Sequence, residues 1–149
     1  MSSFIDRRRV LQAGLAAGTW LLLPTSGRAC EYFVPTLRVL HPWTRASAPG
    51  ATTAVVCMTF DEVVEGDRLI GASTPVAEAA EMGGAGGGPG VNFSIPAGRE
   101  SALTEDGSYL RLLGLRFPLE VARSYPLKLV FEVGGLVSAS LSVDYTRFR

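Results

Sequence analysis

The stretch Ala54-Val55-Val56-Cys57-Met58-Thr59-Phe60 is a nearly continuous apolar run. A run of this length between turn-forming segments is typical of a buried β-strand. Five further segments have the alternation or composition of strands, at residues 37–40, 91–95, 109–113, 127–131 and 136–143. Turn-forming residues separate them at 48–50, 65–67, 96–98, 106–107 and 134–135. Many short strands with turns at intervals of about 8 to 15 residues predict an all-β sandwich.

Two segments of the chain do not fit this strand pattern. Residues 75–82 have the composition of either a short helical turn or a strand, and their short length leaves both open. Residues 83–90 are almost entirely glycine. A glycine cluster that binds phosphate precedes a Lys-Ser/Thr pair or a helix, whereas Pro89-Gly90 leads into a predicted strand. We therefore expect residues 83–90 to form a flexible, exposed loop.

The first 29 residues have the layout of a cleaved export signal. Arg7-Arg8-Arg9 precedes an apolar run that ends at Leu23, and small residues follow up to Ala29. The paired arginines followed by Val10-Leu11 resemble the twin-arginine signal, and an ordinary secretory signal is the alternative. The apolar run has about 14 residues against the ~20 that span a membrane, so an anchor is not expected. The sequence predicts an export signal at residues 1–29 and one domain at residues 30–149 in the periplasm.

The composition of the predicted mature chain limits its partners. Residues 1–29 carry four arginines and one aspartate, so residues 30–149 have 10 basic and 13 acidic side chains. A slightly negative net charge gives no electrostatic attraction to nucleic acid or to an anionic membrane. We therefore expect no nucleic-acid partner and no membrane span in the mature chain.

The two cysteines, Cys30 and Cys57, both remain after removal of the signal. In an oxidising compartment such a pair most often forms a disulfide, which here would stabilise the fold by about 3 kcal/mol. Two alternatives remain open: lipid modification of Cys30, or two free thiols of which one binds a soft metal. Arg28 argues against lipid modification, because it stands where a small residue is preferred.

A set of short motifs follows one order along the chain. They are Trp43-Thr44-Arg45-Ala46, Asp67-Arg68-Leu69-Ile70-Gly71-Ala72, Ile95-Pro96-Ala97-Gly98, and Gly114-Leu115 followed by Pro118-Leu119. In this order the motifs resemble the periplasmic copper chaperone family PCu(A)C, over about residues 36–143. The resemblance implies a cupredoxin-like Greek-key β-sandwich, with Trp43 as a core anchor. It also implies an extracytoplasmic carrier that delivers Cu(I) to cytochrome oxidase, with oxidase assembly proteins as copper acceptors.

The family's copper ligands, two His and two Met side chains, are not matched in this chain. Thioether and imidazole groups suit Cu(I), which is soft and tolerates low coordination numbers. The first family histidine falls on Gly83, and the family's His-x-Met motif falls on Tyr109-Leu110-Arg111. A guanidinium group stays protonated and cannot coordinate a cation. Arg111 therefore either points into solvent or pairs with Glu81 at the former metal position.

The soft donors that remain are few. They are Cys30, His41, Cys57, Met58 and Met82. His41 is the only histidine, and no nucleophile and acid stand around it in a recognisable catalytic pattern, so we expect no enzyme. We predict Met82, displaced by a gap in the alignment, and His41 as metal ligands for Cu(I) at an altered site.

Two functions follow from these residues. One is copper handling and delivery to a respiratory oxidase in the periplasm, through an altered or degraded metal site. The other is a structural or adaptor β-sandwich domain that has lost its metal.

Overall fold

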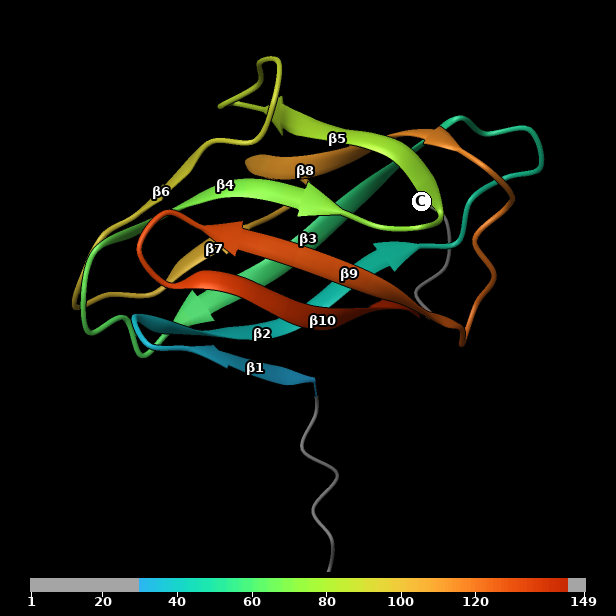
Figure 1. The fold of residues 1–149 in the computed structure, drawn as a ribbon. Coiled ribbons are helices and arrows are strands. Elements are labelled where there is room, and N and C mark those ends of the chain that lie inside the picture. Colours follow the sequence, from blue (N-terminus) through green and yellow to red (C-terminus); the bar gives the residue numbers. More distant parts are fainter. Residues whose placement is uncertain (1–29, 145–149) are drawn as a thin grey trace, which may run out of the picture.

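The computed structural model describes residues 30–144, which form ten β-strands and no helix (Figure 1). The strands are β1 (Glu31–Val34), β2 (Leu37–Arg45), β3 (Thr53–Asp61), β4 (Asp67–Ser73), β5 (Ala77–Gly84), β6 (Phe93–Ile95), β7 (Ser101–Leu103), β8 (Ser108–Leu115), β9 (Ser124–Phe131) and β10 (Gly135–Asp144). The predicted all-β class is confirmed. Residues 75–82 belong largely to a strand, so the helical alternative for them is wrong. The predicted export signal lies outside the described residues.

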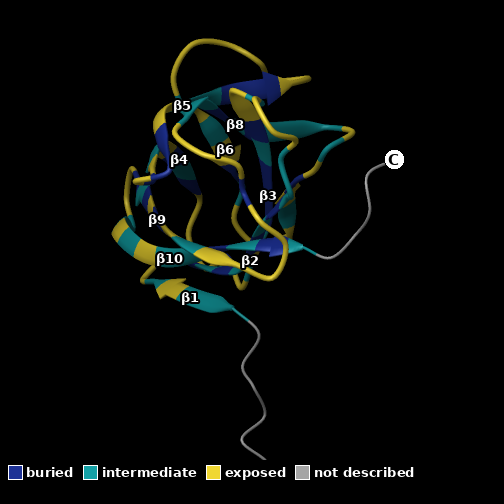
Figure 2. Ribbon diagram, turned by 90° about the vertical axis from the view of Figure 1, so that its right-hand side faces the viewer, coloured by how far each residue is buried: buried dark blue, intermediate teal, exposed yellow. Residues whose placement is uncertain are grey.

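The strands form one curled sheet that is nearly closed. Their order is β5-β8-β3-β2-β10-β9-β4-β6, with β1 paired to β2 and β7 to β3. All pairings between these strands are antiparallel except the parallel joint of β2 and β10 at Trp43–Arg45 and Ser142–Asp144. Figure 2 shows β5 and β8 on one side of the molecule and β2 and β10 on the opposite side, with the buried residues between them. The curl gives each strand an inner face on the core and an outer face.

Alternating side chains of the strands fill the core. On β3, Val56, Met58 and Phe60 are buried and face inward. The Phe60 ring lies 5.9 Å from the ring of Phe93 and 6.0 Å from that of Phe131, measured between centroids. The residues between them on β3 face outward, because successive side chains of a strand point to opposite sides.

A β-bulge interrupts the pairing of β2 with β3. Leu40 pairs with Thr59, but Trp43 pairs with Cys57, so two residues of β2 lie opposite one of β3. His41 has a φ of 43°, in the left-handed region that few residues other than glycine and asparagine adopt readily. Bulges of this kind redirect side chains, and His41 is exposed to solvent.

Residues 84–90 are exposed, as predicted, but Gly83 is buried and belongs with Gly84 to β5, and backbone hydrogen bonds hold the segment. The amide of Met82 donates to the carbonyl of Gly90, and the amide of Gly88 donates to the carbonyl of Met82. Gly84 has a φ of 75°, and a Cβ atom there would lie 1.9 Å from the carbonyl oxygen of Gly107. Only glycine fits this approach of the two backbones, which fixes the start of the loop beside β8.

Candidate functional site

The pairing of β5 with β8 brings together the positions that the resemblance aligned with the family's copper ligands. Glu81 pairs with Arg111, and Gly83 pairs with Tyr109. These four residues share the outer face of the sheet, because Met82 and Leu110 between them are buried in the core. We call Glu81, Tyr109 and Arg111 the β5–β8 cluster.

Arg111 is the centre of the β5–β8 cluster. Its Nη1 lies 3.1 Å from Oε1 of Glu81, and its Nη2 donates to the hydroxyl of Tyr109 at 3.1 Å. Its Cζ atom lies 5.7 Å from the centroid of the Tyr109 ring. The hydroxyl of Tyr109 and the carboxylate of Glu81 raise the pKa of Arg111, so the guanidinium stays charged. Of the two alternatives for Arg111, the structure has the ion pair with Glu81.

The Tyr109 ring covers Gly83. A Cβ atom on Gly83 would lie 2.3 Å from Cε2 of Tyr109, so the ring occupies the space of any side chain at residue 83. A phenol, a carboxylate and a guanidinium offer neither thioether nor imidazole. The cluster therefore does not fit Cu(I), because it lacks soft donors and places a fixed positive charge where the cation would bind.

The two predicted metal ligands, Met82 and His41, do not come together in the structure. Met82 on β5 is 3% exposed and belongs to the core. His41 lies on β2, and β8 and β3 stand between β5 and β2 in the sheet. A gap in the alignment does not make Met82 a surface ligand. Its neighbours Glu81 and Gly83 lie on the outer face, so the Met82 side chain points into the core. Met82 and His41 therefore do not form a shared metal site, because they lie at two separate places in the fold.

The disulfide expected between Cys30 and Cys57 is not formed, and both thiols are free. The sulfur of Cys30 lies 3.8 Å from the hydroxyl oxygen of Ser142 on β10. Cys57 lies on β3, and β2 separates β3 from β10. Because neighbouring strands are about 4.8 Å apart, two strand spacings exceed the Cα separation of about 4.4–6.8 Å that a disulfide allows.

Cys57 lies at a cavity on the outer face of β2 and β3. The cavity has a volume of about 450 Å³, and we call it the β2–β3 cavity; His41, Trp43, Cys57 and Glu105 line it. Cys57 itself is 2% exposed. Burial raises the pKa of its thiol to about 11; the nearby Glu105 carboxylate acts in the same direction, and Arg45 opposes it.

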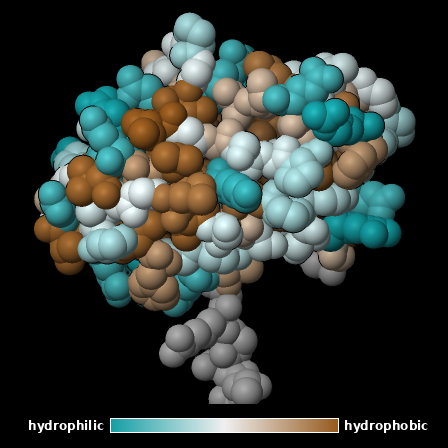
Figure 3. Space-filling model, viewed as in Figure 1, coloured by the Kyte–Doolittle hydropathy of each residue, from teal (hydrophilic) through white to brown (hydrophobic). Residues whose placement is uncertain are grey.

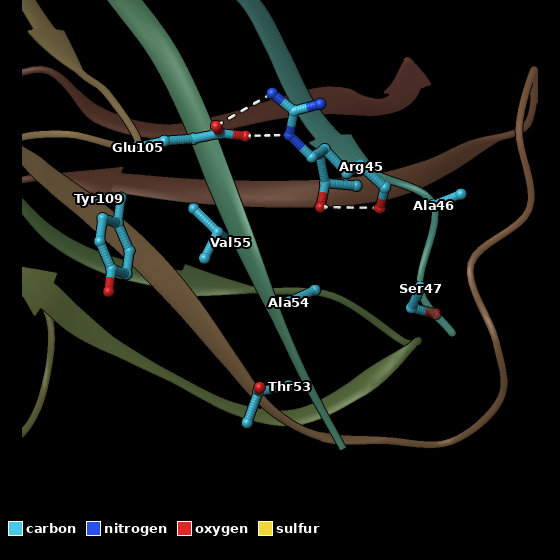
Figure 4. Close-up of a pocket in the computed structure, with 9 residues that line it drawn as sticks. Arg45, Ala46, Ser47, Thr53, Ala54, Val55, Glu105 and Tyr109 are labelled. Carbon is cyan, nitrogen blue, oxygen red and sulfur yellow. Dashed lines mark hydrogen bonds and ion pairs between the residues drawn. The ribbon is translucent and has the colours of Figure 1, made fainter. Parts of the chain in front are cut away.

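An ion pair between Arg45 and Glu105 stands at the edge of this cavity. Nε of Arg45 lies 2.5 Å from Oε1 of Glu105, and the guanidinium carbon lies 5.8 Å from the Trp43 ring centroid. The same pair, with Val55 and Tyr109, lines a second cavity of about 380 Å³. Figure 4 shows these side chains around it. Trp43 therefore lies on the outer face and is not the core anchor that the resemblance implied.

Sequence reasoning missed Glu105 and the role of Arg45. The two residues are 60 positions apart, and no motif links them. Within residues 30–144, no group of three or more His, Cys, Asp or Glu side chains is arranged to hold a metal ion. In the same part of the chain, no helix is long and apolar enough to cross a membrane.

Comparison with known proteins gives matches at the level of family and fold. The family model described as "Putative lipoprotein LpqE-like" matches residues 37–143. The copper-bound PCuAC domain from PmoF2 is 26% identical with a TM-score of 0.70, covering 78% of this chain and 98% of its own. The apo PCuAC domain from PmoF1 is 28% identical with a TM-score of 0.71, covering 78% of this chain and 99% of its own.

A more distant match shows the fold alone. The solution structure of CuI-DR1885 from Deinococcus radiodurans is 24% identical with a TM-score of 0.61, and the match covers 80% of this chain and 83% of that one. A search of curated proteins finds no match.

Proposed function

The chain belongs to the LpqE-like family and has the PCu(A)C-type fold, and from that premise we propose that it handles copper outside the cytoplasm through an altered site. Copper is cargo in this proposal, and no catalytic step is involved. The observation that carries it is the sharing of one cavity by two soft donors, His41 and Cys57, on the outer face that also holds the β5–β8 cluster. The copper-bound PmoF2 domain supports the proposal, because 98% of that domain matches this chain in fold.

The proposed location and partners follow from the same reading. Residues 1–29 would direct export, by the twin-arginine route in our interpretation, to the periplasm. The name of the matched family includes the word lipoprotein, which keeps lipid modification of Cys30 open as an alternative to a free N-terminal residue. The acceptor would be a periplasmic copper protein such as a cytochrome oxidase assembly factor.

A second candidate is an adaptor domain without metal. It is favoured by the β5–β8 cluster, which replaces donors with an ion pair, and by exposed apolar side chains on another part of the surface. Ile70, Val133 and Leu136 are 45%, 53% and 61% exposed. Figure 3 shows apolar surface gathered on the side of the molecule that carries β4, β9 and β10.

A competition titration against a cuprous chelator separates the two functions. Because the β5–β8 cluster has no soft donor, we expect one Cu(I) per chain with a Kd at least about 100-fold above that of a PCu(A)C domain with all four ligands. The titration uses protein that begins at residue 30 and is kept under reducing conditions. This protein retains the fold's elements, because all described strands and the core lie between Glu31 and Asp144. Absence of any copper binding would contradict the copper proposal and favour the adaptor.

A further inference from the structure

The five soft donors of the predicted mature chain lie in different parts of the structure. Met58 and Met82 belong to the core cluster and face the interior, whereas Cys57 is equally buried but lies on the outer face of β3, outside that cluster. Cys30 lies beside Ser142 on β10. His41, Cys57 and Met58 border the same cavity, but Met58 belongs to the core cluster, so His41 and Cys57 are the two donors on its outer side.

The local geometry explains why these two residues border one cavity. Trp43 pairs with Cys57 across β2 and β3, and the bulge begins two residues before Trp43. His41 takes its left-handed conformation within that bulge, so its imidazole leaves the regular alternation of β2. Cys57 forms the buried part of the cavity wall and His41 forms an exposed part.

The thiol of Cys57 has no hydrogen-bond partner among the described residues. A buried thiol without a partner, in the wall of a cavity of about 450 Å³, offers a free sulfur donor. Glu105, Asp106 and Arg45 also line the cavity, so two carboxylates stand against one guanidinium and the net charge favours a cation over an anion. Glu105 is partly neutralised by its ion pair with Arg45.

From this arrangement we infer that the β2–β3 cavity binds one monovalent soft cation, Cu(I), between the sulfur of Cys57 and a ring nitrogen of His41. This inference rests on the proposed copper function and names its site. On binding, the S–H bond of Cys57 breaks, a Cu–S bond forms, and the proton passes to solvent. No electron is transferred, because copper stays in the cuprous state.

A site with two donors suits Cu(I) better than Zn²⁺. Zn²⁺ in structural sites takes four ligands, and the described residues contain no cluster of three. Cu(I) tolerates low coordination and prefers sulfur and imidazole, so a two-donor site suits it. Ag(I) has the same charge and the same preference for soft ligands, and it does not change oxidation state during a titration.

The test is an Ag(I) titration of the protein beginning at residue 30, followed by tryptophan fluorescence and repeated with Cu(I). Trp20 lies in the predicted signal, so Trp43 is the only tryptophan of the protein beginning at residue 30, and it pairs with Cys57 across β2 and β3. We expect a change in Trp43 emission that saturates at one ion per chain. Two variants, Cys57→Val and His41→Asn, should each weaken binding at least tenfold.

The variants are chosen to keep the fold. Valine retains the buried volume of Cys57, and asparagine tolerates the positive φ of His41. Cys30→Ser and Met82→Leu are matched controls that should bind like wild type. Thermal melting checks that each variant is folded before binding is compared.

The outcomes separate this site from the function it rests on. If both Cys57→Val and His41→Asn bind the ion as tightly as the wild type does, the proposed site is overturned, but the copper function is not. Loss of binding in Cys30→Ser or Met82→Leu would also overturn the site, since it would place the ion elsewhere. No binding of Ag(I) or Cu(I) by the wild type would overturn both.

Discussion

Replacing Asp67 with alanine is expected to lower the free energy of unfolding by about 3–5 kcal/mol, because several buried donors would lose their acceptor together. The Asp67 side chain is buried, with 7% of the residue exposed. It accepts hydrogen bonds from the hydroxyl of Thr36 at 2.7 Å and from the amides of Val133 and Gly134, each at 2.9 Å. Urea denaturation of wild type and variant measures the difference.

Asp61→Ala is the matched control for this prediction. Asp61 pairs with Arg38 at 2.6 Å, but both side chains are about one-fifth exposed. We expect a loss of about 1 kcal/mol there. A loss at Asp67 no larger than that at Asp61 would contradict the account of Asp67 as a buried anchor between β4 and the β9–β10 turn.

The same carboxylate makes stability depend on pH. Burial alone would raise the pKa of Asp67, but hydrogen bonds from Thr36, Val133, Arg68 and Gly134 outweigh it and leave the pKa below its usual value. A carboxyl group with a lowered pKa stabilises the fold above its unfolded pKa of about 3.9, and this stabilisation is lost as the pH falls through the folded pKa. Asp67→Ala should therefore show a weaker loss of stability than wild type as the pH falls below about 4.

The second large effect is expected from restoring the family's donors on β5 and β8. The triple variant Gly83→His, Tyr109→His and Arg111→Met places two imidazoles and one thioether at the β5–β8 cluster and removes its positive charge. We expect Cu(I) affinity to rise at least about 100-fold over wild type in a chelator competition.

The single variant Gly83→His is the control for the triple variant. Because the Tyr109 ring fills the space beside Gly83, a histidine there has no room until Tyr109 is replaced. The single variant should gain no copper affinity and should be less stable than wild type. If the triple variant is folded and gains no affinity, the β5–β8 cluster does not correspond to the family's copper position.

The fold could be predicted wherever a segment had a clear apolar run or a regular alternation. The predicted strands at 54–60, 127–131 and 136–143 each lie within an observed strand. Three strands were missed for identifiable reasons. β4 contains a register shift between Leu69 and Gly71 that breaks its alternation, and β1 and β7 have only four and three residues.

The candidate site was predictable only in part. The pairing of Glu81 with Arg111 could be proposed from charge and alignment, and the structure contains it. The burial of Met82 depends on strand phase, which the short segment 75–82 left ambiguous between helix and strand. The shared cavity of His41 and Cys57 depends on a bulge in β2. Pro42 is consistent with an interruption of the strand there, but the sequence does not show which side of the sheet His41 faces.

The most direct test of the central claim is an NMR map of the ion's position in the protein beginning at residue 30. Amide signals are recorded during addition of Ag(I), and then of Cu(I), up to one equivalent. We predict shifts centred on residues 40–43 of β2 and 56–58 of β3, with residues 81–83 and 109–111 unchanged. Shifts centred on 81–83 and 109–111 would contradict the account, because they would place the ion at the β5–β8 cluster despite its guanidinium.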